Sequence, residues 1–235
     1  MAKIYLSAAA HATDNPTKCP NKCGENVHCN EYMDIVEKRL KALGIDVKRG
    51  DKTKTGNTAL QSRVKEANEW GADIYYVAHT NAGGGRYSMT MCYPDSASKK
   101  KAQVFHKYRK CVSSHKVTTR SDLYEINATK MPCMYDELFF HDNATDCKWF
   151  HEGGMEKLAE ETVHALCELC GVTYKAPSTD NNAKVKELES KVKTLQSEKD
   201  SLNKEISNLN KEISTLNAKI TELKAKISAA KKALA

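Results

Sequence analysis

Three polar side chains follow predicted strands at the point where each strand ends. His11 comes shortly after the first strand, His79 ends a strand in the middle of the chain, and Glu137 lies near the end of the last one. Parallel strands bring such ends to one edge of a sheet, which is where α/β proteins bind ligands. A fourth candidate, Glu31, opens the first long predicted helix directly after Asn30.

Two histidines and one carboxylate with an open fourth position form a ligand set of catalytic zinc hydrolases. A further carboxylate supplies the general base. We therefore expect His11, Glu31 and His79 to be the zinc ligands and Glu137 to be the base. Glu25 is the rival for the acidic ligand, because it lies between the same strand and helix. Glu31 is preferred because a helix start gives a ligand a rigid base.

Asp136 is the rival base, as it directly precedes Glu137 in the sequence. Adjacent residues of a strand face opposite ways, so only one of the two can face the metal. The remaining histidines are interpreted as ordinary surface or core residues: His28, His106, His115, His141, His151 and His164.

The chain has nine cysteines, an odd number without the density of a disulfide scaffold, and we expect mostly reduced thiols. Cys19, Cys23 and Cys29, together with His28, could hold a second zinc ion. They lack the paired Cys-x2-Cys knuckles of a zinc ribbon, so ordinary thiols are favoured. A nucleophilic thiol, for example Cys133, is the other enzymatic alternative, but no local signature of a thiol hydrolase accompanies it.

The elements that must position these residues alternate between strands and helices. Strands are expected over residues 3–7, 45–48, 73–78, 88–93, 123–126 and 133–138. Helices are expected over residues 31–43, 59–70, 96–114 and 155–170. This alternation predicts an α/β fold with a mostly parallel twisted sheet and helices on both of its faces.

A different pattern begins after a linker rich in turn formers, residues 175–182. Apolar residues then recur in steps of three and four from Val185 to Ile227. Valine or isoleucine at position a, interrupted by Lys199, and leucine at position d favour a parallel two-stranded coiled coil. We therefore expect a catalytic domain over 1–174, a coiled-coil helix over 183–235, and a homodimer formed through that helix.

Composition excludes several other classes of protein. The net charge of +7 comes without a basic stripe interleaved with aromatic residues, so we expect no nucleic-acid partner. No apolar run approaches the roughly 18 residues of a membrane span, and the first residues lack a secretory signal. We expect a protein made in the cytoplasm without a Sec signal.

Four short stretches of sequence are similar to those of one enzyme family. They are the position of His11 after the first strand and the motifs NEY at 30–32, VAHTNA at 77–82 and YDELFFHDN at 135–143. In this order they resemble the zinc-dependent N-acetylmuramoyl-L-alanine amidases of the amidase-3 type, particularly the catalytic domains of phage endolysins, over about residues 2–173. The resemblance implies that His11, Glu31 and His79 hold zinc and that Glu137 is the catalytic acid and base.

The resemblance also implies the reaction. A zinc-activated water would hydrolyse the amide bond between N-acetylmuramic acid and L-alanine in bacterial peptidoglycan, with action on the cell wall during phage lysis or outside the cell. Asn81 either orients the site or caps its loop. The alternative is a catalytically inactive cell-wall-binding or coiled-coil interaction protein.

Overall fold

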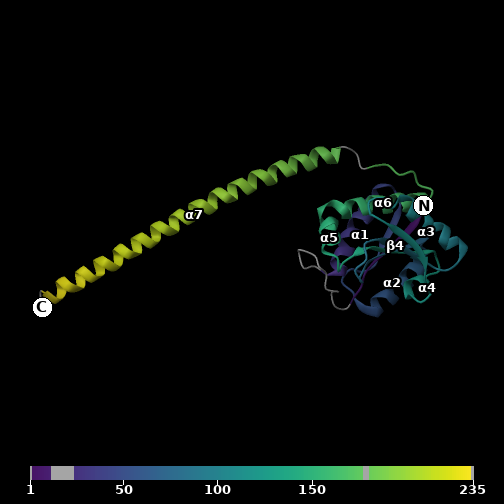
Figure 1. The fold of residues 1–235 in the computed structure, drawn as a ribbon, viewed down its shortest axis with the longest axis horizontal. Helices are drawn as coiled ribbons and strands as arrows, with labels where there is room; N and C mark the ends of the chain where they lie inside the picture. The colour runs from purple at the N-terminus through teal and green to yellow at the C-terminus, as the bar shows by residue number, and fades with distance from the viewer. Residues whose placement is uncertain (1, 12–23, 177–179, 234–235) are drawn as a thin grey trace. The chain divides into compact units, whose positions relative to one another are not determined.

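The computed structural model describes residues 2–11, 24–176 and 180–233. The chain divides into two compact units, Met1–Lys175 and Ala176–Ala235. The first contains a sheet with its helices, and the second contains one long helix (Figure 1).

The first unit is built on a six-stranded sheet with the order β2-β1-β3-β6-β4-β5. Its strands are β1 Lys3–Ala8, β2 Asp46–Arg49, β3 Ile74–Asn81, β4 Ser88–Cys92, β5 His115–Thr119 and β6 Cys133–Phe140. Neighbouring strands run parallel except β4 and β6, which pair antiparallel. The predicted mostly parallel α/β sheet is confirmed.

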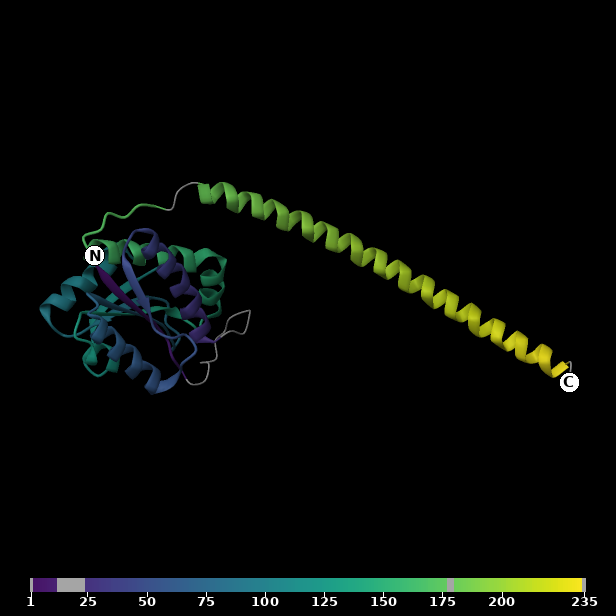
Figure 2. The ribbon, with the colours of Figure 1, turned by 180° about the vertical axis from the view of Figure 1, so that it is seen from behind.

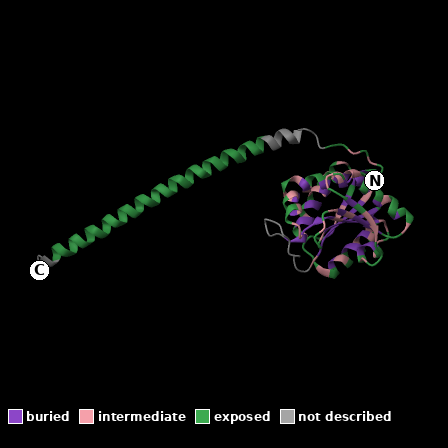
Figure 3. Cartoon of the chain, viewed as in Figure 1, coloured by how far each residue is buried: buried purple, intermediate pink, exposed green. Residues whose placement is uncertain are grey.

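Helices cover both faces of this sheet (Figures 1 and 2). They are α1 Glu25–Ala42, α2 Gly56–Trp70, α3 Ser96–Tyr108, α4 Tyr124–Ala128, α5 Ala144–Trp149, the π-helical turn η1 Phe150–Gly154 and α6 Met155–Leu169. Helices α1, α3 and α6 pack together on one face, while α2 and α4 lie on the other. The buried strands between them form the centre of the unit (Figure 3).

Alternation along each strand divides the core into two clusters. In β1, Ile4 and Leu6 belong to the cluster beneath α1 and α6, whereas Tyr5 belongs to the cluster beneath α2. Tyr75 and Tyr76 of β3 separate in the same way. All five side chains are almost completely buried, which explains why these strands read as continuous apolar runs.

Two expectations about local structure away from the predicted site were wrong. Residues 123–126 form the start of α4 and not a strand, because Glu125 turns inward to accept hydrogen bonds from the hydroxyls of Ser7 and Tyr75, both at 2.7 Å. The helix expected over 96–114 ends at Tyr108, and β5 follows it. Arg109 leaves the helix, with its guanidinium buried in the core. Tertiary contacts outweighed local strand propensity at the first place and local helix propensity at the second.

The second unit contains helix α7, Asp180–Ala233. The long C-terminal helix is confirmed, and from Leu188 to Ile227 its apolar seam is exposed, with leucine, valine and isoleucine side chains 48–65% accessible. None of the helices in the described ranges combines the length and apolar composition of a membrane span.

Candidate metal centre

Two parallel strands bring the predicted histidines to one edge of the sheet. β1 and β3 pair in register at Ala8 and Ala78, and the Ala9 N–H donates to the Ala78 carbonyl at 2.9 Å. His79 directly follows Ala78, and His11 lies three residues beyond Ala8. Their rings meet edge to face with centroids 5.5 Å apart. The topology therefore places both histidines together as expected.

Glu25, the first residue of α1, lies between these rings. Its Oε2 is 2.9 Å from His11 Nε2, and its Oε1 is 3.2 Å from His79 Nδ1. The Thr80 N–H also donates to Oε1, at 2.9 Å. The Glu25 side chain is only 1% exposed, while that of His11 is 38% exposed. One carboxylate thus joins both histidines at a centre open to solvent on one side.

Glu31, the acidic ligand expected from the sequence, does not belong to this group of side chains. The first helix begins at Glu25 and not at Glu31. Six residues later, at 3.6 residues per turn, a side chain has rotated by about 240°, and Glu31 is exposed to solvent. Asn30 does not cap a helix start; its side-chain amide donates to the Asn26 carbonyl, 2.8 Å away, within the helix. Glu25 therefore has the rigid position at a helix start that was expected for Glu31.

The donor set suits a divalent metal ion. One ligand atom from each of His11, Glu25 and His79 lies within 4.8 Å of the other two, and these three form the one such group of His, Cys, Asp and Glu side chains found in the described ranges. The buried His79 Nε2 has no hydrogen-bond partner there. Two imidazoles and a carboxylate are ligands that zinc prefers.

Electrostatics keeps Glu25 ionised. Burial opposes its charge, but hydrogen bonds from His11 and His79 lower the pKa of the carboxyl well below its ordinary range. The same contact with Glu25 raises the pKa of His11. A buried negative charge that faces two imidazoles favours a cation between them.

Glu137 lies beside this centre on β6. It pairs in register with His79 of β3, so both side chains lie on the same face of the sheet. Its Oε2 is buried without a hydrogen-bond partner among the described residues. Burial raises the pKa of Glu137 to about 7, opposed by His79 and assisted by the charge of Glu25. A carboxyl that titrates near neutrality is suited to proton transfer.

The Asp136 side chain points to the opposite face of the sheet from Glu137, where it forms hydrogen bonds within the core. Its Oδ2 accepts from Arg109 Nη2 at 2.6 Å and from the Tyr76 hydroxyl at 2.9 Å, and its Oδ1 accepts from the Thr90 hydroxyl. Asp136 is 1% exposed. Because side chains alternate along β6, Asp136 points into the hydrophobic core while the adjacent Glu137 points towards the metal centre.

Neighbouring side chains hold His79 in place. Tyr135 stacks on its ring at a centroid distance of 4.6 Å and an interplanar angle of 19°. The Thr80 hydroxyl, whose residue already binds Glu25 through its N–H, lies 2.9 Å from His141 Nδ1. His141, interpreted from the sequence as an ordinary residue, thus supports the metal centre indirectly, through its contact with Thr80.

The loop after β3 forms the rim of the centre. The Asn81 side-chain oxygen accepts from the Ala82 N–H at 2.8 Å, a contact typical of a capped loop. Gly83 and Gly84 donate their N–H groups to Asp142 Oδ2, at 2.8 and 2.9 Å. These two backbone N–H groups are therefore bound by the protein's own carboxylate and fix the loop.

Cys29 and Cys133, both in the described part of the chain, give no support to a thiol enzyme. Cys19 and Cys23 lie outside the described residues. Cys29 and Cys133 are buried, and burial raises the pKa of both thiols well above its ordinary value. A nucleophilic cysteine needs a lowered pKa and access to substrate, and neither of these two thiols has them.

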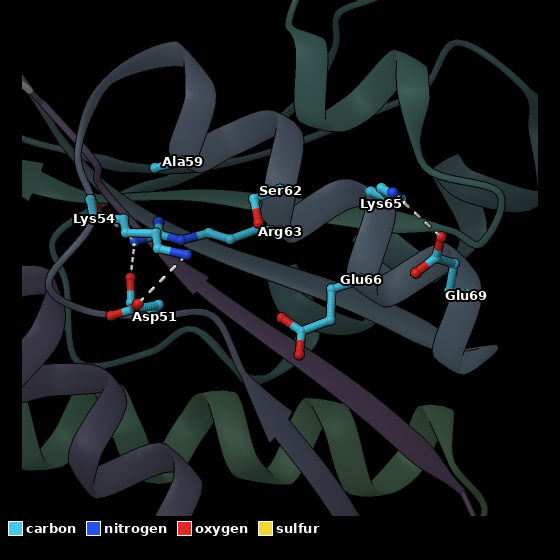
Figure 4. A pocket seen from close by; sticks show the side chains of 8 residues that line it. All are labelled: Asp51, Lys54, Ala59, Ser62, Arg63, Lys65, Glu66 and Glu69. Atoms are coloured by element: carbon cyan, nitrogen blue, oxygen red, sulfur yellow. Dashed lines mark hydrogen bonds and ion pairs between the residues drawn. The ribbon is translucent and has the colours of Figure 1, made fainter.

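A separate pocket of about 420 Å³ lies along α2 (Figure 4). Its lining includes Asp51, Lys54 and Arg63, but none of the residues of the metal centre. Arg63 donates to the Ala8 carbonyl at 2.6 Å and to the Asp51 carbonyl at 2.8 Å. This wall of the pocket anchors the end of β1, from which His11 follows.

Comparisons with known proteins identify the family and the fold of the chain. The sequence profile of the N-acetylmuramoyl-L-alanine amidases of the amidase-3 type matches residues 7–168. No curated protein sequence matches the chain.

Several solved structures share the fold. The catalytic domain of CwlV, an N-acetylmuramoyl-L-alanine amidase from Paenibacillus polymyxa, has 23% identity and a TM-score of 0.64, with 74% of this chain and 100% of that chain covered. The catalytic domain of the CD27L endolysin, which targets Clostridium difficile, has 19% identity and a TM-score of 0.63, with coverage of 72% and 98%. The CwlD amidase of Clostridioides difficile, solved with the GerS lipoprotein, has 16% identity and a TM-score of 0.63, with coverage of 73% and 99%.

The structural matches establish a common fold, and the profile match covers well over half of the chain. The resemblance noted in the sequence is thereby confirmed. This chain belongs to the amidase-3 family of N-acetylmuramoyl-L-alanine amidases.

Proposed function

We propose that this chain is a zinc-dependent amidase of bacterial peptidoglycan. It cuts the amide bond between the lactyl group of N-acetylmuramic acid and the L-alanine of the stem peptide. The observation that carries the proposal is the buried Glu25 carboxylate shared by His11 and His79, with Glu137 beside them on the next strand. Membership of the amidase family supports the class of substrate.

His11, Glu25 and His79 would hold the metal, in place of the set with Glu31 expected from the sequence. When bound, zinc supplies Lewis-acid chemistry, since it lowers the pKa of a water molecule towards about 7 and polarises a carbonyl group. Glu25 contributes a negative charge that stays ionised at neutral pH, because hydrogen bonds outweigh its burial. Tyr135 and the Thr80 backbone restrict the side chains that bind the ion.

Glu137 performs the proton transfers. Its carboxylate accepts a proton from the attacking water as the water oxygen bonds to the scissile carbonyl carbon. The resulting acid then donates that proton to the alanine nitrogen as the carbon–nitrogen bond breaks. The products are the muramic acid carboxylate and a stem peptide with a free amino terminus. A pKa of about 7 suits both directions of transfer.

The tail supports a second part of the proposal. Its exposed seam, with valine and isoleucine at position a and leucine at position d, fits a parallel coiled coil with a second copy of the chain. Lys199 would face its own copy at position a and disfavour larger assemblies. Two catalytic domains on one dimer would raise the effective concentration of the second at the cell wall once the first is bound.

Hydrolysis of a defined muramyl peptide tests the activity. We expect the zinc-loaded protein to release a peptide with a new alanine amino terminus, detected by mass spectrometry, and a chelator to stop the release. Cleavage elsewhere in the fragment would contradict the proposed bond. Binding without cleavage by zinc-loaded protein would support the inactive binding module instead.

A further inference from the structure

A row of side chains crosses the sheet from the proposed base to the edge strand. Glu137 of β6 pairs in register with Met89 of β4, and Met89 pairs with Lys116 of β5. His79 continues the row on the other side of Glu137. Register partners lie on the same face, and two strand spacings of about 4.8 Å put the Lys116 backbone about 10 Å from that of Glu137.

Arg120 adds a second positive charge on this face. It follows Lys116 by four residues, which places it about 13 Å further along the strand direction, and because side chains alternate, both lie on the side of Glu137. Its backbone N–H continues the strand ladder by donating to the Cys92 carbonyl at 3.0 Å. The Arg120 guanidinium forms an ion pair with both carboxylate oxygens of Asp122, at 2.7 and 2.5 Å. This hydrogen bonding and the charge of Asp122 raise the pKa of Arg120, and the charge of Glu137 makes a smaller contribution.

This part of the sheet is open to solvent. Helix α3 packs on β4 and β5 from the opposite face, where Ala102 and Phe105 are buried. On the side of Glu137, Met89 is only partly buried and Lys116 is exposed. The Lys116 ammonium lies 3.7 Å from the centroid of the Tyr87 ring, which limits its freedom. A solvent-open strip thus extends from Glu137 across β4 to β5, with Lys116 level with Glu137 and the ion-paired Arg120 further along the strand direction.

The substrate has a matching negative charge. The second residue of the stem peptide is a glutamic acid linked through its γ-carboxyl, which leaves its α-carboxyl either free or amidated. One alanine separates this group from the scissile nitrogen, and an extended residue spans about 3.5 Å. The α-carboxyl can therefore lie about 7 Å from the reacting bond, within reach of a long basic side chain on the strip.

We propose that Lys116 and Arg120 bind this α-carboxylate and make the enzyme prefer stem peptides in which it is free over those in which it is amidated. The inference rests on the proposed amidase function and assigns it a substrate class. The two residues touch the substrate away from the reacting atoms, so they set specificity and take no part in proton transfer.

Two substrates that differ only in this group provide the test: N-acetylmuramoyl-L-alanyl-D-glutamic acid and the corresponding D-isoglutamine compound. We expect a lower KM for the acid in the parent protein. Lys116→Gln and Arg120→Gln should each raise that KM about two- to fivefold, the range of an exposed ion pair, and the double variant about 5- to 20-fold. The kcat for both substrates and the KM for the amide should change less than about twofold, and added salt should reduce the preference.

Lys100→Gln is the matched control, since Lys100 is exposed on α3, which covers the opposite face. Equal KM values for the acid and the amide in the parent protein would overturn the inference, as would the same loss of preference in the control. Titration of both compounds into the Glu137→Gln protein, followed by NMR, reports carboxylate binding without hydrolysis. If neither compound is cut but the acid still binds more tightly through the two cations, the proposed reaction fails while the binding site stands.

Discussion

Replacement of Glu137 by glutamine should remove activity and at the same time stabilise the metal-free protein. The change keeps the size of the side chain and removes its ability to carry a proton. Loss of a general base costs roughly 10² to 10⁴ in rate. We expect kcat for a muramyl peptide to fall by that factor, while zinc content stays near that of the parent.

The gain in stability follows from the pKa of Glu137. Burial raises it from an ordinary 4.5 to about 7 in the folded chain. The folded state therefore holds the proton more tightly than the unfolded state, and stability is lost as pH rises from about 4.5 to about 7. At about 1.4 kcal/mol for each pH unit, the penalty above pH 7 reaches up to about 3 kcal/mol. Glutamine carries no charge and avoids it.

Thermal unfolding after chelation measures this penalty. For a domain of this size, 1 kcal/mol corresponds to about 2–4 °C in Tm. The Glu137→Gln variant should melt up to about 6–12 °C higher than the parent at pH 8, and the difference should shrink towards pH 5. A variant that melts lower than the parent at pH 8, or that keeps full activity with zinc bound, would refute the reasoning.

Asp136→Asn is the contrasting change at the adjacent residue. It leaves the buried guanidinium of Arg109 without its counter-charge, which costs about 3–5 kcal/mol. We expect its Tm to fall by about 6–20 °C. Asp136 is consequently a probe of the core and would be a poor activity control for Glu137.

The other predictions concern the metal and the tail. Glu25→Gln should lower the zinc content of the purified protein, measured by atomic absorption, to a small fraction of the parent's value, whereas the exposed Glu31→Gln should leave it unchanged; the reverse result would restore Glu31 as the ligand. Chelation should abolish hydrolysis and addition of zinc should restore it, so full activity in metal-free protein would contradict a metal mechanism. In sedimentation equilibrium the full chain should behave as a dimer, and deletion after Asp180 should leave an active monomer; a single 26.2 kDa species for the full chain at micromolar concentration would exclude the coiled-coil dimer.

The features that the sequence alone determined are those encoded by local periodicity and short motifs. The long α7 helix follows from a seven-residue repeat that needs no partner to be recognised. Membership of the amidase-3 family follows from short sequence motifs around His11, His79 and Glu137. The opposite directions of Asp136 and Glu137 follow from the two-residue period of a strand.

Only the tertiary structure decided where α1 begins and therefore which glutamate meets the histidines. Asn30 has the side chain of a helix cap, but Arg49 from β2 donates to both its carbonyl and its side-chain oxygen at 2.9 Å, and the helix continues back to Glu25. Such a contact joins residues 19 positions apart in the sequence. Local capping rules cannot anticipate it, because the free energy that places Glu25 between His11 and His79 comes from elements that meet only in the folded chain.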